Sequence, residues 1–415
     1  MFQTLLIRHF KSIEQADIAL GDINIFVGNN GSGKSNIVDA IRFLKDVATN
    51  GLDRAISDRH GIESIRQWSP TRPFRISLTV TVSRDDDKFE YTVGIDSAKG
   101  LFQVAQEKAK LEAVNEHYFE TEDGEEHHIR NFEHITVVRN KAGDAAVSKS
   151  TLDLEPGESP PKAYSLEWNP KTKREEDKFR VEANDEVMLN SRPYYPHANI
   201  AKLRRVLSDF QAYSIYPNTL RIPQEPSSET FLSPEGRNLG SVVKRMRKTK
   251  RGVEALGLVT DALKSIHPSL ERISILSVGG YLVPQFHMLE PSGKRHIFNV
   301  SQMSDGTLRV LGLLVALYQE PRPAVIALEE PEQTVNPAIL AVIADAIKEV
   351  SKRSQILVTT HSPNLLDQFE PSDIRSVELH DGKTIAGPVS PLQMAVVRDR
   401  LFSLGELLVS EGLHS

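Results

Sequence analysis

A glycine-rich segment near the start of the chain has the residue types that bind phosphate. It reads Gly28-Asn29-Asn30-Gly31-Ser32-Gly33-Lys34-Ser35, and Asn36 follows as part of a predicted helix. Glycines let successive backbone N–H groups close around phosphate oxygens, and a helix N-terminus adds partial positive charge. The residues expected to bind a nucleoside triphosphate are Asn29, Asn30, Gly31, Ser32, Gly33, Lys34, Ser35 and Asn36.

Two side chains of this segment should contact the nucleotide and its metal directly. Lys34 is expected to reach the β- and γ-phosphates, and the Ser35 hydroxyl is expected to be a ligand of Mg²⁺. The preceding residues, Ile23–Val27, are apolar and β-branched like a buried strand, and the following residues have helical apolar spacing. A chance glycine-rich turn would not be expected in this context. The sequence therefore predicts a P-loop for a triphosphate with Mg²⁺.

A second cluster of reactive side chains follows an apolar strand in the C-terminal half, Val325–Leu328. Carboxylates at the carboxyl end of a parallel strand lie where α/β sheets bind ligands. Glu329 is expected to hold Mg²⁺ through its water shell, and Glu330 to orient or deprotonate the attacking water. A solvated acidic turn is the alternative, and the P-loop elsewhere in the chain argues against it.

Two further motifs could contact phosphate. His361 ends another apolar strand, Gln355–Thr360, from which a histidine can reach the γ-phosphate or the attacking water. Ser304-Asp305-Gly306-Thr307 opens a predicted helix, whose N-terminus can bind an anion. One nucleotide does not need two such sites, so this one is expected to serve the nucleotide of another subunit. Taken alone, the segment is equally an ordinary N-capped helix.

After the P-loop helix, the sequence pattern changes from helical spacing to the alternation typical of strands. Phe74–Val82 and Phe89–Ile95 alternate with period two around the acidic turn Asp85-Asp86-Asp87, which predicts an antiparallel hairpin. Strand-like pieces follow at Leu101–Leu111 and Ile135–Arg139. The proline-containing, mixed-charge stretch Asp153–Arg180 is expected to be a loop or a mobile insertion.

Helical patterns return from residue 200, and strands then alternate with helices. Helices are predicted at Ile200–Tyr213, Gly240–Met246, Gly306–Tyr318 and Pro337–Ser351. Strands are predicted at Ile273–Val278, Ala324–Leu328 and Gln355–Thr360. This alternation indicates a mostly parallel core sheet.

Composition narrows the class of protein further. The chain has 415 residues, a net charge of −6 and no cysteine, which excludes disulfides and thiolate chemistry. There is no signal-peptide pattern and no run of apolar residues long enough to cross a bilayer, so a cytoplasmic protein is expected. His127-His128 is expected to lie at the surface without binding a metal, because no ligand pattern surrounds it.

One short segment is strongly basic although the whole chain is acidic. Its cations are Lys244, Arg245, Arg247, Lys248, Lys250 and Arg251. Such a cluster is suited to contact the phosphate backbone of DNA or RNA. It is equally typical of a solvated helix end whose charge complements the helix dipole.

The order of these motifs resembles the ABC-type ATPase heads of the SMC/RecF/OLD class, and in particular stand-alone bacterial predicted ATPases that often occur in phage-defence operons. Additional similarity lies in Arg8–Ile13, Leu220–Leu239, Asn336-Pro337 and Leu404–Leu408. The resemblance implies an α/β P-loop fold with a mixed core sheet, an appended antiparallel β-sheet and a helical lobe. It implies a single head over residues 1–415, with parts at 1–72, 73–195 (with an insertion near 153–180), 196–272 and 273–415.

The resemblance also implies roles for residues. Ser304 and Gly306 would be the signature that reaches the γ-phosphate of a partner's ATP in a homodimer or higher homo-oligomer, and His361 would be the switch histidine. The loop from Glu332 to Pro337 would link the two sites. Transporter signatures have glycine at the position of Asp305, and many relatives have aspartate at the position of Glu329. Both departures fit the RecF/OLD-like branch, so a transporter subunit is disfavoured. Gln211 and Gln224 remain alternative candidates for the glutamine loop.

Two biological roles follow from the resemblance. OLD-type nucleases continue into a domain rich in acidic metal ligands, whereas the last stretch here offers Glu406 and Glu411, so no nuclease is expected in this chain. The first role is an ATPase that controls a separate nuclease or toxin effector in antiviral defence. The second is a RecF-like ATPase that binds DNA directly in repair or recombination.

Overall fold

The computed structural model describes residues 1–70, 73–84, 86–120, 126–155, 158, 171–180, 186–190 and 198–415. The chain divides into two compact units. The first comprises Met1–Leu20, Asp39–Ser208 and Asp381–Ile385, and the second comprises Gly21–Val38, Asp209–His380 and Ala386–Ser415. Among the helices of the described ranges, none has the length and apolar character that a membrane crossing requires.

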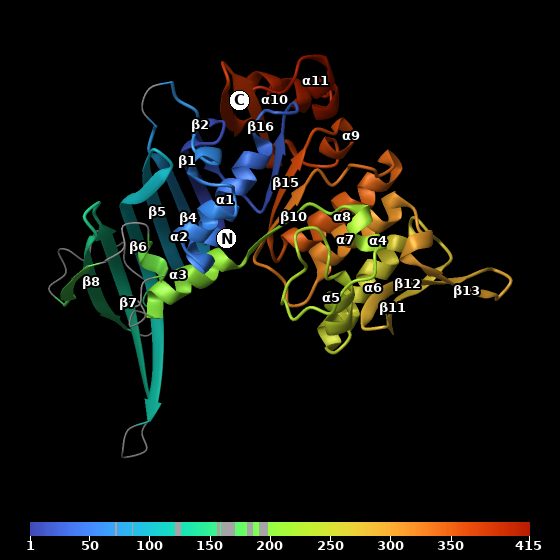
Figure 1. Ribbon diagram of the computed structural model, residues 1–415, viewed down its shortest axis with the longest axis horizontal. Helices are drawn as coiled ribbons and strands as arrows, with labels where there is room; N and C mark the ends of the chain where they lie inside the picture. Colours follow the sequence, from blue (N-terminus) through green and yellow to red (C-terminus); the bar gives the residue numbers. More distant parts are fainter. Residues whose placement is uncertain are drawn as a thin grey trace. The chain divides into compact units, whose positions relative to one another are not determined.

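An antiparallel sheet forms the first unit (Figure 1). Its strand order is β2-β1-β4-β5-β6-β7-β8-β9. The strands are β1 (Phe2–Phe10), β2 (Ile13–Ala19), β4 (Ile76–Arg84), β5 (Asp87–Ala98), β6 (Leu101–Glu120), β7 (Glu126–Arg139), β8 (Asp144–Leu154) and β9 (Lys173–Arg180). The predicted hairpin is confirmed, because Leu78 pairs with Val93 and alternate residues of both strands are buried. Asp85 lies outside the described residues.

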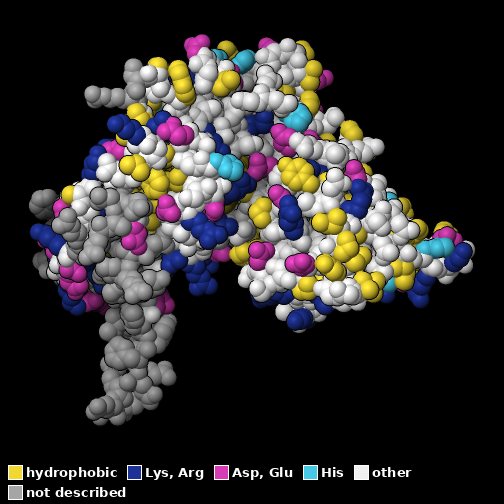
Figure 2. Space-filling view, in the orientation of Figure 1, with side chains coloured by type: hydrophobic (Ala, Val, Ile, Leu, Met, Phe, Trp, Pro, Cys, Tyr) yellow, Lys and Arg dark blue, Asp and Glu magenta, His cyan; other side chains and the backbone are white. Residues whose placement is uncertain are grey.

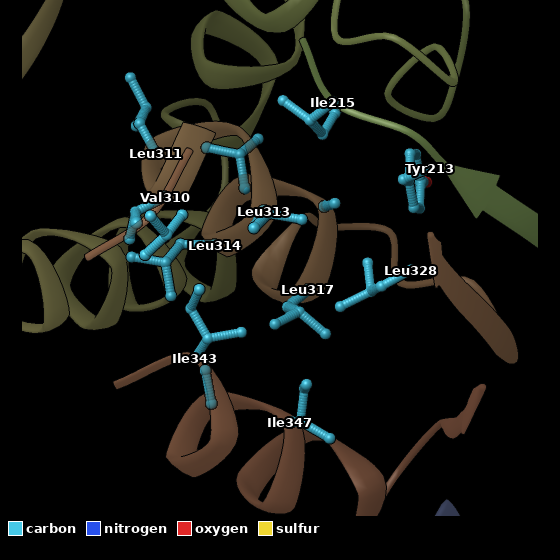
Figure 3. Close-up of a cluster of buried hydrophobic side chains, with 14 of the residues drawn as sticks. Tyr213, Ile215, Val310, Leu311, Leu313, Leu314, Leu317, Leu328, Ile343 and Ile347 are labelled. Carbon is cyan, nitrogen blue, oxygen red and sulfur yellow. The ribbon is translucent and has the colours of Figure 1, made fainter. Parts of the chain in front are cut away.

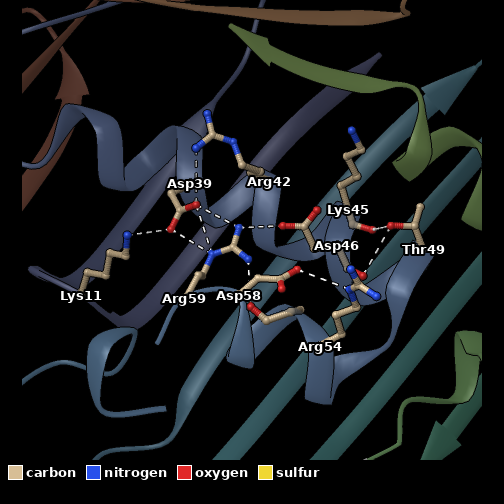
Figure 4. Close-up of polar contacts among 10 residues, drawn as sticks. Lys11, Asp39, Arg42, Lys45, Asp46, Thr49, Arg54, Asp58 and Arg59 are labelled. Atoms are coloured by element: carbon tan, nitrogen blue, oxygen red, sulfur yellow. Dashed lines mark hydrogen bonds and ion pairs between the residues drawn. The ribbon is translucent and has the colours of Figure 1, made fainter. Parts of the chain in front are cut away.

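Helices pack on this sheet and carry a buried ionic network. They are α1 (Lys34–Asn50, which enters this unit at Asp39), α2 (Leu52–Ser57), α3 (Ala198–Ser208) and the 3-10 turns η1 (Ile62–Ser64) and η3 (Met188–Asn190). Asp39 of α1 lies 2.7 Å from the Lys11 ammonium and 2.9 Å from the Arg59 guanidinium (Figure 4). Burial opposes ionisation of Asp39, but hydrogen bonds and charge from Arg59 and Lys11 together lower its pKa.

The second unit contains the sheet on which the sequence places the P-loop. Its strand order is β10-β14-β15-β3-β16-β17. The strands are β3 (Ile23–Val27), β10 (Phe210–Tyr213), β14 (Val325–Glu329), β15 (Gln355–Thr360), β16 (Ile374–His380) and β17 (Lys383–Pro388), of which β17 belongs to this unit from Ala386. The four pairings among β10, β14, β15, β3 and β16 are parallel, which confirms the predicted parallel core.

A three-stranded antiparallel sheet and several helices complete this unit. The sheet has the order β11-β12-β13, with β11 (Leu270–Val278), β12 (Tyr281–Leu289) and β13 (Arg295–Asn299). The α-helices are α4 (Pro217–Arg221), α5 (Leu239–Met246), α6 (Lys250–Lys264), α7 (Asp305–Tyr318), α8 (Leu340–Ser351), α9 (Pro363–Leu366), α10 (Pro391–Arg398) and α11 (Leu404–Ser410). The 3-10 turns are η5 (Val300–Gln302), η6 (Pro337–Ile339) and η7 (Pro371–Asp373).

Helix α7 lies at the centre of the core of the second unit. Twelve consecutive residues, Thr307 to Tyr318, are buried, as expected for a helix that is enclosed on all sides. Figure 3 shows Leu314 directed toward Ile343 of α8, and Leu317 close to Leu328 of β14 and Ile347 of α8. Because this packing fixes the axis of α7, the residues at its N-terminus are presented from a rigid support.

Three predictions about elements are wrong. The helix predicted at Ile200–Tyr213 ends at Ser208, because residues 210–213 pair in parallel with β14 and this tertiary contact outweighs the local pattern. The strand predicted at Ile273–Val278 pairs antiparallel with β12 instead of joining the parallel core. Both ends of the predicted loop Asp153–Arg180 are strands, since β8 reaches Leu154 and β9 pairs with β8, while residues 159–170 lie outside the described residues.

Candidate functional site

The P-loop connects β3 to α1 with a geometry that requires glycine. A Cβ on Gly28 would lie 2.0 Å from the backbone oxygen of Val377 on β16, so no larger residue fits there. Gly31 and Gly33 have φ values of 81° and 103°, a region that other residues rarely adopt. Helix α1 then starts at Lys34, so its first backbone N–H groups face the loop.

Lys34 lies inside this loop. Its side chain is buried, and the ammonium donates hydrogen bonds to the backbone oxygens of Gly28 at 2.8 Å and Asn29 at 3.0 Å. Burial lowers the pKa of Lys34, and the negative charges of Glu330 and then Glu332 oppose that shift. The structure therefore brings the P-loop lysine and the acidic residues after β14 together.

The turn after β14 holds Glu330 in a strained conformation. Glu329 is the last residue of β14 and pairs with Thr359 of β15. The Glu330 N–H donates to the Thr359 backbone oxygen at 2.9 Å, and its φ is 45°, which is unfavourable for a residue with a side chain. Residues held in such conformations cluster at functional sites, where the surrounding structure maintains the strain.

His361 lies between two carboxylates. Its Nδ1 is 3.8 Å from Glu330 Oε1 and 3.5 Å from Glu332 Oε1. Glu332 Oε1 also accepts hydrogen bonds from the Thr360 hydroxyl at 2.7 Å and from the His361 backbone N–H at 3.0 Å. Glu332, whose side chain is 8% exposed, therefore fixes the end of β15 to the turn after β14. The sequence indicated Glu332 only as part of a loop.

The residues at this sheet edge are suited to a nucleoside triphosphate with Mg²⁺. The P-loop contains a buried ammonium group, that of Lys34, and two glycines with positive φ, Gly31 and Gly33, that let its backbone curve. Ser35 exposes its hydroxyl on the first turn of α1, and Glu329 offers a carboxylate at the end of β14. Hard oxygen donors of this kind are the ligands that Mg²⁺ prefers.

The segment expected to be the signature begins helix α7. Ser304 is exposed and is the N-cap residue, since its hydroxyl accepts a hydrogen bond from the Thr307 N–H at 3.2 Å. Asp305 forms an ion pair at 2.5 Å with Arg221 of α4, which explains an acidic residue at this position. A Cβ on Gly306 would lie 3.1 Å from the Thr334 backbone oxygen, so the loop after Glu332 packs closely on this helix start.

Arg309, which the sequence did not single out, links α7 to the acidic turn. It is 1% exposed, and its guanidinium donates to the backbone oxygen of Glu330 at 2.7 Å and to that of Ile215. A guanidinium offers several donors in a fixed plane, so one side chain can hold two carbonyls at once. Helix α7 and the strained Glu330 turn are thereby joined within one chain.

Neither candidate for the glutamine loop lies at the carboxyl edge of the sheet. Gln211 is within β10, paired with Ile326. Gln224 is buried, where it accepts a hydrogen bond from the Gly240 N–H at 2.7 Å and donates to the Gly236 oxygen at 3.1 Å. Tyr216, which lies between β10 and α4, is exposed.

The basic segment uses part of its charge to hold the backbone. Arg245 donates to the oxygens of Glu229 and Thr230, Arg247 donates to the oxygen of Ile273, and Lys244 donates to Ser277 at 3.2 Å. Lys248, Lys250 and Arg251 are exposed. Figure 2 shows Lys and Arg side chains spread among acidic and apolar ones on the visible face of the second unit.

The acidic residues near the C-terminus have structural contacts. Glu406 accepts a hydrogen bond from the Ser403 N–H at 2.8 Å in the capping box of α11. Glu411 accepts one from the Gln393 amide at 3.0 Å. Within the described residues there is no group of three or more His, Asp or Glu side chains arranged to hold a metal ion. The side chains of His127-His128 lie outside the described residues.

Comparisons with known proteins agree with this architecture. The solved structure of an Smc head domain with an extended coiled coil, bound to the C-terminal domain of ScpA derived from Pyrococcus furiosus, matches with a TM-score of 0.50 and 13% identity. That match covers 96% of this chain and 99% of the other, and it supports the fold alone. An SmcHead bound to the C-winged helix domain of ScpA matches at a TM-score of 0.48 and 14% identity, over 95% and 99% of the two chains.

Curated relatives share a short segment. The DNA replication and repair protein RecF of Proteus mirabilis (strain HI4320) is 63% identical over 41 residues, which are 10% of this chain and 11% of that protein. The match therefore spans about a tenth of the length of the curated relatives. A family model described as "AAA domain, putative AbiEii toxin, Type IV TA system" matches residues 23–367, from the first residue of β3 to the residue that follows α9. The chain belongs to this AAA-domain family, and its identification as an ABC-type ATPase of the SMC/RecF class is confirmed.

Proposed function

We propose that this protein binds ATP with Mg²⁺, hydrolyses the bond between its β- and γ-phosphates to give ADP and phosphate, and dimerises around the nucleotide. The observation that carries the proposal is the gathering of Lys34, Glu330 and His361 at one edge of the parallel sheet. A lysine in a P-loop beside a carboxylate that can accept a proton is the arrangement that phosphoryl transfer to water requires. The cytoplasm is the compartment in which we expect this activity.

Each residue at this edge has a defined task in the proposal. Lys34 neutralises charge on the β- and γ-phosphates, and Ser35 and Glu329 hold Mg²⁺, which neutralises phosphate charge when bound. Glu330 accepts the proton of the attacking water. His361 orients that water or contacts the γ-phosphate, and its backbone is fixed by the hydrogen bond to Glu332. Water and phosphate are thus positioned by groups from three neighbouring strands.

Two substitutions test hydrolysis directly. Glu330→Gln preserves the shape of the side chain but removes the base, so we expect ATP to bind while turnover falls at least about a hundredfold. Lys34→Ala should abolish nucleotide binding, measured by titration with a fluorescent ATP analogue. Lys250→Ala, a change at an exposed position outside this edge, is the matched control. Turnover by Glu330→Gln at the parental rate would show that the base has been assigned to the wrong residue.

The dimer is proposed because the unit has two helix N-termini that can bind phosphate, α1 and α7, whereas each nucleotide needs one P-loop. Ser304 and Gly306 would contact the γ-phosphate bound by the partner. Mixing Lys34→Ala with Ser304→Arg tests this arrangement, because a mixed dimer regains one intact site. We expect about a quarter of parental activity, since about half of the dimers are mixed and each has one working site. Mixing without recovery argues for a site within one chain.

For the biological role, we propose control of a separate nuclease or toxin effector in antiviral defence. The description of the matched family, which names a toxin–antitoxin system, supports this role. The experiment is purification of the Glu330→Gln protein with the products of neighbouring genes, with and without ATP. Retention of a nuclease or toxin that depends on ATP supports the role, and recovery of the ATPase alone under both conditions argues against it.

A RecF-like role on DNA is the second candidate. The match to RecF over 41 residues and the exposed cations favour it. The exposed members of the basic segment are Lys244, Arg247, Lys248, Lys250 and Arg251, and the last three take no part in the contacts to Ser277 and Ile273 described above. Contacts to phosphates make affinity fall steeply with salt, so DNA binding that requires ATP, weakens with salt and is lost on replacing these three cations with glutamate would favour the second role.

A further inference from the structure

The exposed hydroxyl of Ser304 is the first member of a chain of hydrogen bonds that leads into the protein. Its Oγ lies 2.8 Å from Thr307 Oγ1, and Thr307 Oγ1 lies 2.8 Å from His267 Nε2. Thr307 is 2% exposed, so its hydroxyl has no alternative partner in bulk water. A surface hydroxyl, a buried hydroxyl and an imidazole are therefore connected in series.

The N-cap alone does not require this series. Capping α7 uses only the hydrogen bond from the Thr307 backbone N–H to Ser304 Oγ. The contact with His267, which is 40 residues away in sequence, adds nothing to that cap. His267 is held in place by its own backbone, whose N–H donates to the Leu263 oxygen at the end of α6 at 2.9 Å.

The direction of the series decides what Ser304 can offer to a ligand. A hydroxyl has one proton to donate, and a neutral imidazole donates from one nitrogen only. If His267 Nε2 carries the proton, it donates to Thr307, Thr307 donates to Ser304, and the Ser304 proton is left for an external acceptor. If Nε2 is bare, Thr307 donates to His267, and the Ser304 proton is used on Thr307.

The two directions are alternatives only for a neutral imidazole, because a protonated ring donates from both nitrogens. Burial favours the neutral form, since it lowers the pKa of His267. An outward-pointing lone pair on Ser304 would repel a phosphate oxygen, whereas an outward-pointing proton would bind it. In the first direction Ser304 offers its proton to an anion without losing a hydrogen bond, whereas in the second it must first give up its bond to Thr307.

We propose that His267 is a positioning residue that acts through Thr307 to turn the Ser304 hydroxyl proton outward, toward the γ-phosphate of a partner's ATP. This inference rests on the proposed dimer in its last step, but the direction of the hydrogen bonds is a property of the chain without ligand. The two can therefore be tested separately.

The first experiment needs no nucleotide. In the protein labelled with ¹⁵N-histidine, NMR distinguishes the two neutral tautomers, and His267→Gln assigns the signal. We expect His267 to be protonated at Nε2. Protonation at Nδ1 overturns the proposal, whatever the protein does with ATP.

The second experiment measures ATP-dependent dimerisation by light scattering, with Glu330→Gln as the parent. Thr307→Val keeps the shape but removes the hydroxyl, and His267→Leu removes the donor. Both should weaken the dimer about tenfold, as the loss of one oriented hydrogen bond to a charged group would, without changing ATP affinity at the P-loop. Thr307→Ser and His267→Gln, which place an O–H or N–H donor at the same positions, should restore the parental dimer.

A matched control is present in the same unit. His287 Nε2 lies 2.7 Å from the Ser274 hydroxyl on the β11–β12 pair, so His287→Leu breaks an equivalent bond away from α7 and should leave the dimer unchanged. A parent that stays monomeric with ATP refutes the proposed dimer and leaves the NMR result to decide the orientation. If the parent dimerises and the Thr307→Val variant dimerises equally well, the role of the hydrogen-bond series is refuted.

Discussion

Glu107 should make the stability of the first unit depend on pH in a direction opposite to most carboxylates. It lies on β6, is fully buried, and accepts hydrogen bonds from the Tyr91 hydroxyl and the Met188 backbone N–H, both at 2.7 Å. Arg139, also buried, is its register partner on β7. Removal from water outweighs these favourable contacts and raises the pKa of Glu107 to about 7.

The sign and size of the effect follow from the two protonation equilibria. The unfolded chain releases this proton near pH 4.5, whereas the folded chain keeps it until about pH 7. Between these values folding requires proton uptake, so stability falls as pH rises and does not change further above the folded pKa. At about 1.4 kcal/mol per pKa unit, the contribution lost across this window is about 3 kcal/mol.

Urea unfolding of the full chain, followed by circular dichroism at pH 5 and pH 8, measures this contribution. Glu107→Gln replaces the acid by a neutral amide of the same shape, so the comparison isolates one group from all others. We expect the free energy of unfolding of the parent, minus that of the variant, to be lower at pH 8 than at pH 5 by about 2–3 kcal/mol. An equal difference at both pH values, or a larger one at pH 8, would refute the reasoning.

Three further predictions concern particular contacts. Asp39→Asn removes the carboxylate that pairs with both Lys11 and the buried Arg59, which then keeps only Asp46, and should cost about 3 kcal/mol in urea unfolding. Asp58→Asn, which breaks an exposed pair, should cost less than about 1 kcal/mol. Gly306→Ala places a methyl 3.1 Å from a backbone oxygen and should weaken the ATP-dependent dimer measured by light scattering, while nucleotide affinity stays parental. Arg309→Met releases the carbonyl of the strained turn and should lower kcat at least about tenfold with little change in KM for ATP, and an unchanged kcat would contradict the link drawn from α7.

The motifs could be predicted because each is short and its residues are adjacent in sequence. Gly28–Ser35 needs only a strand before it and a helix after it, and both are evident in the local apolar pattern. That Lys34 and Glu330 meet also follows from sequence, once β3, β15 and β14 are recognised as neighbouring parallel strands whose carboxyl ends share an edge.

The contacts that support those motifs could not be predicted in the same way. Arg221 meets Asp305 across 84 residues, and His267 meets Thr307 across 40, so no local period indicates either pair. Strand β10 continues a helical apolar spacing and becomes a strand only because β14 offers a partner. Strand β9 consists largely of charged residues, and its pairing with β8 has no hydrophobic pattern to reveal it.

Helix α7 gives a physical reason why assembly and hydrolysis would be coupled in this protein. Its first turn carries Ser304 and Gly306, and its next turn carries Arg309, which holds the Glu330 carbonyl at 2.7 Å. Because the rest of the helix is enclosed by the core, it can respond to a force on its N-terminus only as a rigid body. A partner's phosphate that pulls on Ser304 would therefore also shift the strained Glu330, the residue proposed to accept the proton of water. Helix α7 would therefore transmit the contact with the partner at Ser304 directly to the proposed base, Glu330.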